Sequence, residues 1–286
     1  MLGLTAVNLK INLSREVGDN LKKSGNSPTD MEQRWDQRAE IYNEFQKKDK
    51  SLIPAKVVTY LSKRGVLDDQ KVLDVGGGTG RYAILFGIYA KAVALTDIST
   101  QMIKYALENA QEAKIDNIHF EKLDWNQVDL AKKKMAKAYD FVFASMCPSI
   151  RGGEGFEGLE KMVAASRNWC GINQFIYHRD SLYEELVEEF GAPSHPDPHN
   201  DREFVSTVFN YLWEQGYEVN IHTLSDTQTT FYPVETVLAD YWATFSEVAK
   251  KEKKSFEKII RTSSEDGQIG ITNELTTALI LWQVKK

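Results

Sequence analysis

Apolar and polar positions along this chain predict strands and helices in regular alternation. Short apolar runs typical of buried strands lie at 71–75, 92–98, 118–124, 139–146 and 174–180. Segments with helical spacing lie near 54–64, 81–89, 101–113, 156–168 and 202–215. This alternation indicates an α/β fold with a doubly wound, mostly parallel sheet.

Two more strands and a helical insert complete this prediction. Residues 217–225 and 275–284 predict an antiparallel edge pair, which makes the sheet seven-stranded. Residues of about 233–260 predict a helical insert before the last strand. The aromatic residues in and before this insert fit either the inner face of a lid or packing on the sheet edge: Phe231, Tyr232, Tyr241, Trp242 and Phe245.

The N-terminal part predicts an arm followed by a covering helix. Residues 1–28 form the arm, which is either a flexible leader or, because its apolar residues alternate, a docked strand. Ser27 can cap the helix that follows. We expect one domain over 29–286, with segments 29–48 and 233–260 closing over one pocket at the carboxyl ends of the strands.

Composition and charge narrow the class of protein. Among the 286 residues, 42% are hydrophobic and 27% are charged, which is typical of globular proteins. A membrane helix needs roughly 18 consecutive apolar residues, and this chain has no such run, so we expect no membrane span. The net charge of −6 disfavours a nucleic-acid partner. Two cysteines and no secretory signal suggest a cytoplasmic protein, and a homodimer stays open.

A glycine-rich turn, VGGGTGRYA, follows the first predicted strand. A phosphate-binding P-loop needs a lysine after its last glycine, but Arg81 follows Gly80, so a P-loop is excluded. Gly78, Gly80 and Ala83 do match the alanine form of the dinucleotide fingerprint. An NAD-type reading therefore stays open on spacing alone.

Acidic residues end three successive predicted strands. Asp74 would oppose a pyrophosphate and favour a ligand with an ammonium group. Asp97 can accept from two ribose hydroxyls. Asp124 can accept from an adenine amino group, and Trp125 can lie against the ring. S-adenosylmethionine, which joins a nucleoside to an amino acid through a sulfonium, fits this set of acids.

The segments VLDVGGGTG, ALTDIS, EKLDW and YDFVFASM resemble the class I S-adenosylmethionine-dependent methyltransferase superfamily over about residues 30–180. The resemblance implies S-adenosyl-L-methionine as the cofactor. It places the methionine part at the glycine turn, the ribose at Asp97 and the adenine at Asp124. Trp35 and Tyr42 of the covering helix either contact ligands or only pack. The implied cofactor-binding residues are Asp74, Gly76, Gly78, Gly80, Asp97, Ile98, Asp124, Trp125, Ser145, Met146, Trp35 and Tyr42.

The end of the fourth predicted strand carries no known acceptor motif. Superfamily members that methylate exocyclic amines of adenine or glutamine have Asn/Asp-Pro-Pro-aromatic here, whereas this chain has Ser145 and Met146, which we expect to line the methyl-transfer side. Pyrimidine C5 methyltransferases use Pro-Cys, but here Cys147 precedes its proline. We therefore expect Cys147 to be buried rather than nucleophilic.

His178 and Tyr42 are the candidate catalytic residues, and a structural role is the alternative for His178. The proline-rich loop with His195 and His199 fits turns, so we expect no metal site. The expected reaction is methyl transfer from S-adenosylmethionine to a small-molecule acceptor. The alternatives are an NAD-type oxidoreductase and a non-catalytic protein that binds S-adenosylmethionine.

Overall fold

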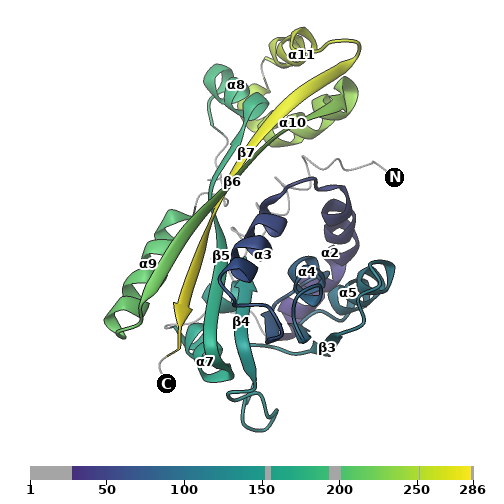
Figure 1. The fold of residues 1–286 in the computed structure, drawn as a ribbon. Helices are drawn as coiled ribbons and strands as arrows, with labels where there is room; N and C mark the ends of the chain where they lie inside the picture. Colours follow the sequence, from purple (N-terminus) through teal and green to yellow (C-terminus); the bar gives the residue numbers. More distant parts are fainter. Residues whose placement is uncertain (1–27, 152–155, 193–200, 251, 285–286) are drawn as a thin grey trace.

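Figure 1 shows a twisted sheet with helices on both faces. The predicted N-terminal arm, and the loop with His195 and His199, lie outside the residues that the structure describes. This computed structural model describes residues 28–151, 156–192, 201–250 and 252–284.

The sheet has seven strands in the order β3-β2-β1-β4-β5-β7-β6. Strands β1 to β5 run parallel to their neighbours, whereas β7 is antiparallel to both β5 and β6. The predicted α/β fold with a final antiparallel pair is thus confirmed. The strands are β1 (Lys71–Val75), β2 (Ala92–Asp97), β3 (Ile118–Lys122), β4 (Tyr139–Ser145), β5 (Ser166–Asp180), β6 (Val219–Pro233) and β7 (Gln268–Gln283).

The helices form two layers and an outer group. Helices α3, α4 and α5 cover one face of the sheet, α7 and α9 cover the other, and α2 packs along α5. The helices are α2 (Pro28–Lys48), α3 (Ile53–Lys63), α4 (Arg81–Gly87), α5 (Thr100–Glu112), α6 (Pro148–Arg151), α7 (Glu157–Ala165), α8 (Ser181–Phe190), α9 (Arg202–Glu214), α10 (Val234–Ala249) and α11 (Lys253–Thr262).

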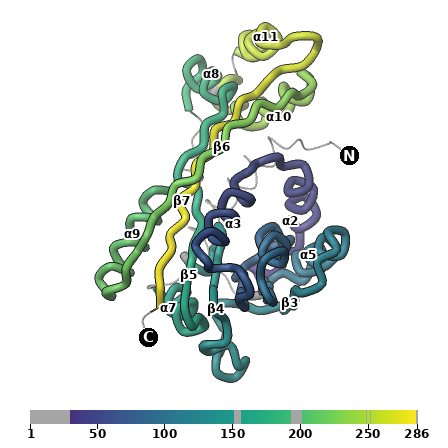
Figure 2. Tube along the Cα trace, in the orientation of Figure 1, coloured from purple at the N-terminus to yellow at the C-terminus, as the bar shows by residue number. Residues whose placement is uncertain are grey.

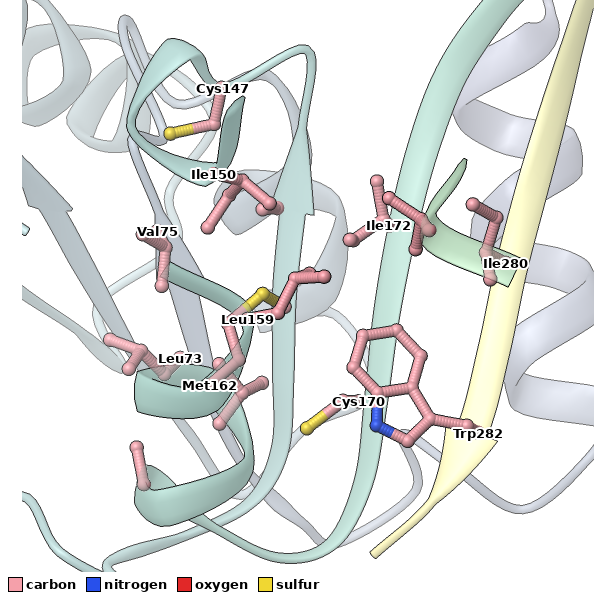
Figure 3. Close-up of a cluster of buried hydrophobic side chains, with 14 of the residues drawn as sticks. Leu73, Val75, Cys147, Ile150, Leu159, Met162, Cys170, Ile172, Ile280 and Trp282 are labelled. Carbon is pink, nitrogen blue, oxygen red and sulfur yellow. The ribbon is translucent and has the colours of Figure 1, made fainter. Parts of the chain in front are cut away.

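Alternation of side chains along the strands divides the core. In β1, Val72 packs with the α3 and α4 layer, whereas Leu73 packs with the α7 layer. Figure 3 shows the α7 side, where Leu159 and Met162 lie among the buried side chains of the strands. Asp74 shares the parity of Val72, so its side chain points toward the α4 layer.

Strands β5, β6 and β7 are much longer than the others. They have 15, 15 and 16 residues, whereas β1 to β4 have 5 to 7. Beyond the pairing of Ser145 with Asn173, the three long strands continue alone. We call this part the strand extension; it comprises residues 174–180, 223–233 and 268–278. Figure 2 shows it running past the rest of the sheet, with α8, α10 and α11 around it.

Element boundaries differ from the sequence prediction at several places. Strand β5 begins at Ser166 and not at Gln174, and β7 begins at Gln268 and not at Leu275. The helix predicted at 156–168 ends at Ala165, because Ser166 already pairs with Tyr139 of β4. Strand β6 continues to Pro233, since each of its polar residues pairs with β7. Helix α8 was not predicted; the Asp180 side chain caps it.

Candidate functional site

The glycine-rich turn joins the end of β1 to α4. Gly76, Gly78 and Gly80 have φ angles of +64°, +55° and +91°, a region that L side chains rarely adopt. At Gly76 a Cβ would lie 2.4 Å from the Cys147 Sγ, so no side chain fits there. At Gly78 the nearest atom is the Tyr42 Cε1, 3.7 Å from where a Cβ would be. The turn therefore presents bare backbone to α2.

Asp74 lies just before this turn, with only 1% of its surface exposed. Neither carboxyl oxygen has a hydrogen-bond partner of normal geometry among the described residues. Burial raises the pKa of Asp74 to about 8; the backbone N–H of Ala83 opposes part of this rise and the charge of Asp97 adds to it. A buried carboxyl group without partners is costly, so the site is suited to a positively charged ligand group.

Asp97 ends β2 beside the same turn. Its Oδ2 accepts from the Gly78 N–H at 3.0 Å, and its Oδ1 accepts from the Ser99 N–H at 2.9 Å. Burial raises the pKa of Asp97 to about 6, and these two N–H groups limit the rise. Since a carboxylate can accept several hydrogen bonds, Asp97 holds the turn and keeps acceptor capacity for ligand hydroxyls.

Helix α2 covers the turn through its second half. The Thr79 hydroxyl donates to the Gln46 side chain at 2.5 Å, and Arg81 forms an ion pair with Asp49. Tyr42 lies one helical turn before Gln46, near Gly78, and its pKa is raised, mainly by burial. The prediction of an N-terminal helix over the glycine turn therefore agrees with the geometry.

The first half of α2 lies against the start of α5. Asp36 accepts from the Ser99 hydroxyl at 2.6 Å and from the Gln101 N–H at 3.0 Å. Trp35 is half-buried beside it, and half-buried Ile98 follows Asp97 directly. These contacts fix α2 next to Asp97, where the resemblance implies the ribose.

Asp124 and Trp125 follow β3, as predicted. The Asp124 Oδ1 accepts from the Asn126 N–H at 2.9 Å and so supports a turn. The Trp125 indole N–H donates to the Gly158 carbonyl at 3.1 Å, and its ring belongs to the core cluster on the α7 side. The ring is 3% exposed and offers little surface to an adenine, so adenine contact by either residue stays a prediction.

The end of β4 brings Ser145 and Met146 to the same edge as the glycine turn. Met146 has a φ of +50°, which is uncommon for a residue with a side chain and is concentrated at functional sites. Buried Asn173 of β5 donates to the Tyr82 hydroxyl at 3.0 Å and to the Ser145 hydroxyl at 3.4 Å. Sequence reasoning missed Tyr82 and Asn173, because only the packing of α4 against the sheet brings them together and no local motif marks them.

A cleft lies between the end of α2 and the strand extension. Its empty space, part of which is open to solvent, is about 660 Å³. The α2 side contributes Phe45 and residues 48–51. On the extension, His178 pairs in register with Leu275, and Asp180 pairs with Asn273, so these lining residues share one face. His178, a candidate from the sequence, therefore lies in a cleft.

The insert before β7 packs onto the same extension. Tyr241 and Phe245 of α10 are fully buried in a third cluster with α8 and α11, and the Tyr241 hydroxyl donates to Asp180 at 2.6 Å. Tyr232 lines the cleft, whereas Phe231 is 65% exposed and, by alternation along β6, lies on the other face. The buried aromatic residues of the insert therefore pack in the core of the strand extension and do not form the inner face of a lid. Helix α10 reaches the cleft only through the hydrogen bond from Tyr241 to Asp180.

Residues 67–168 match the family model described as a methyltransferase domain. Over these residues the chain is similar to methyltransferase domains. The match covers the glycine turn, Asp74, Asp97 and the end of β4. A methyltransferase domain implies S-adenosylmethionine as the cofactor, and this confirms the cofactor predicted from the sequence.

Solved structures share the fold of this methyltransferase. A putative S-adenosyl-L-methionine-dependent methyltransferase from Methanococcus maripaludis is 16% identical, with a TM-score of 0.50 over 65% of this chain and 88% of its own. An S-adenosylmethionine-dependent methyltransferase from Aquifex aeolicus is 17% identical, with a TM-score of 0.48 over 85% of this chain and 98% of its own. Comparison with curated proteins gave no match.

The described ranges also lack two features that membrane or metal binding can require. No helix within them combines the length and the apolar character that crossing a membrane requires. In the same part of the chain, no three His, Cys, Asp or Glu side chains come together so that they could hold a metal ion.

Proposed function

We propose that this methyltransferase transfers the methyl group of S-adenosylmethionine to a small-molecule acceptor. The observation that carries the proposal is Asp74, a buried carboxyl group without partners among the described residues, next to the bare backbone of the glycine turn. An α-ammonium group would supply its missing counter-charge. A pyrophosphate offers Asp74 no such counter-charge, which argues against an NAD-type enzyme.

The chain's own residues then divide the work of holding the cofactor. Gly76, Gly78 and Gly80 let the ligand approach the backbone, and Asp97 accepts from the ribose hydroxyls. Ile98, Asp124, Trp125, Ser145, Met146 and Trp35 keep their implied roles as proposals.

The bound cofactor supplies an already activated methyl group, so the protein mainly positions the acceptor and excludes water. Tyr42 and α2 close the side above the turn, next to the cleft that contains Phe45 and His178. We assign residues 29–286 to one domain, in which α2 and the insert at 233–260 border the acceptor side.

Transfer of labelled methyl groups tests the proposal. The protein is incubated with methyl-labelled S-adenosylmethionine and a whole-cell extract, and the labelled product is identified. Label in a small molecule supports the proposal, whereas label only in protein or nucleic acid contradicts it. Asp74→Asn is the matched negative variant, with Asp116→Asn, on an exposed residue after α5, as its control.

A further inference from the structure

The cleft between α2 and the strand extension adjoins the glycine turn. Phe45 lines the cleft one helical turn after Tyr42, which contacts Gly78. Asp49 also lines the cleft and pairs with Arg81, the first residue of α4. A molecule in the cleft would therefore lie next to a ligand held at the turn.

Three carboxyl groups are the most buried charged groups of this cleft. Asp49, Asp180 and Asp226 are each less than a tenth exposed. Arg81 pairs with Asp49 and Lys56 pairs with Asp226, so each of these two charges is balanced by a cation.

Asp180 differs because its hydrogen-bond partners are uncharged. It accepts from the N–H groups of Leu182 and Tyr183 at 3.0 Å and from the Tyr241 hydroxyl at 2.6 Å. Burial raises the pKa of Asp180, while these hydrogen bonds and the nearby His178 favour its charged form. Beside His178, the inner cleft therefore holds a carboxyl group whose hydrogen bonds favour its charged form and which forms no ion pair with a lysine or arginine among the described residues.

The positive lining groups lie at the rim. Lys48 is exposed and forms an ion pair with Glu44, and Lys50 is exposed as well. No arginine is among the described residues that line the cleft. A carboxylate or phosphate on the acceptor would find no buried counter-charge and would lie near Asp180.

His178 is held in a defined orientation. Its Nε2 lies 3.2 Å from the Asn273 Oδ1. Because an amide oxygen can only accept, this bond requires the tautomer with the proton on Nε2.

We propose that the cleft binds a small amine as the methyl acceptor, with Asp180 attracting its ammonium group. The inference rests on the proposed function, because an acceptor is needed only if the turn holds a methyl donor. Before the amine attacks, the N–H bond of R–NH3+ breaks, the proton passes to solvent, and the neutral amine keeps the electron pair.

Three probes of matched shape test the charge preference without the cofactor. Benzylamine, benzyl alcohol and benzoate are titrated into the full chain, and the ring proton signals of His178 are followed by NMR. We expect benzylamine to shift these signals, benzyl alcohol to act more weakly and benzoate not to act. An equal or larger response to benzoate, or no response to benzylamine up to its solubility limit, overturns the inference.

Variants separate this inference from the proposed function. Asp180→Asn keeps a helix-capping side chain but loses the charge, and we expect it to weaken benzylamine binding at least tenfold. His178→Gln provides a second variant, and saturation with S-adenosylhomocysteine is measured for each protein. Glu274→Gln, at a carboxylate that pairs with Arg179 outside the cleft lining, is the matched control. If Asp180→Asn binds both S-adenosylhomocysteine and benzylamine as the unmodified chain does, only this inference is refuted. If the unmodified chain does not bind S-adenosylhomocysteine at all, the proposed function is refuted.

Discussion

The two halves of the sheet differ in how they are built. Strands β1 to β4 are short and parallel, and the candidate cofactor-binding side chains lie at or just after their carboxyl ends. Strands β5, β7 and β6 are long, end in antiparallel pairs and continue past that edge as the strand extension. The first half carries the proposed cofactor site, and the second carries one wall of the cleft.

This difference separates two kinds of structural information. In the cofactor half, the site residues are neighbours in sequence, because Asp74 and the three glycines lie within seven consecutive residues, 74–80. The cleft half is non-local, since His178, Asp226 and Asn273 reach one face only through the register of three strands. Changes in the first half should alter cofactor binding, and changes in the second should leave it intact.

The largest expected effect is that of Asp74→Asn on binding of S-adenosylhomocysteine. An α-ammonium left in a buried site without its counter-charge costs about 3–5 kcal/mol, which corresponds to at least a hundredfold weaker binding. Isothermal titration calorimetry measures it. Asp116→Asn should bind as the unmodified chain does. If Asp74→Asn binds within threefold of the unmodified chain, Asp74 does not hold the ammonium group.

Asp74→Asn should also remove a loss of stability that the unmodified protein shows as pH rises. The folded pKa of Asp74 is about 8, against 3.8 for the ordinary group, so the folded state holds a proton that the unfolded state has released. The free energy of unfolding should therefore fall as pH rises from about 4 to 8, by at most about 1.4 kcal/mol per pH unit from this group. Urea unfolding across this range should show Asp74→Asn gaining on the unmodified protein as pH rises. A constant difference between the two proteins would refute the assignment.

A smaller effect is expected in the cleft half. Tyr241→Phe removes a hydrogen bond to the Asp180 carboxylate, worth about 1.5–3 kcal/mol of folding stability. Thermal unfolding should detect this loss, while the affinity for S-adenosylhomocysteine stays unchanged. Tyr211→Phe is the control. The Tyr211 hydroxyl donates to Glu160 at an exposed site, so its removal should cost less folding stability. Weaker cofactor binding in Tyr241→Phe would show that the two halves are coupled.

The smallest effect on activity is expected for Cys147→Ser. Burial raises the pKa of Cys147 to about 12, so the group is a thiol at neutral pH and not a nucleophile. Methyl transfer should stay within about twofold of the unmodified rate, and the protein should lose about 1 kcal/mol of stability at most. Mass spectrometry of the reacting protein checks the first point, because a substrate adduct on Cys147 would contradict it.

The sequence allowed much of the fold and part of the candidate site to be predicted. The strand-helix alternation, the covering helix α2 and the glycine turn follow from local patterns, since apolar spacing and glycine act over a few residues. The length of β6 was underestimated because Asp226 to Thr230 are polar and become a strand only by pairing with β7. Asn173 and Tyr82 lie apart in sequence, so only the fold brings them to the end of β4.

A comparison of two cofactor classes, each tested for binding by itself, tests the central claim most directly. A ligand at about 100 times its dissociation constant stabilises the fold by about 2.7 kcal/mol, which raises the melting temperature of a chain this size by several degrees. S-adenosylhomocysteine and NAD are added separately to the full chain, and thermal unfolding is recorded. The account predicts a rise with S-adenosylhomocysteine and none with NAD. A rise with NAD and none with S-adenosylhomocysteine would contradict it.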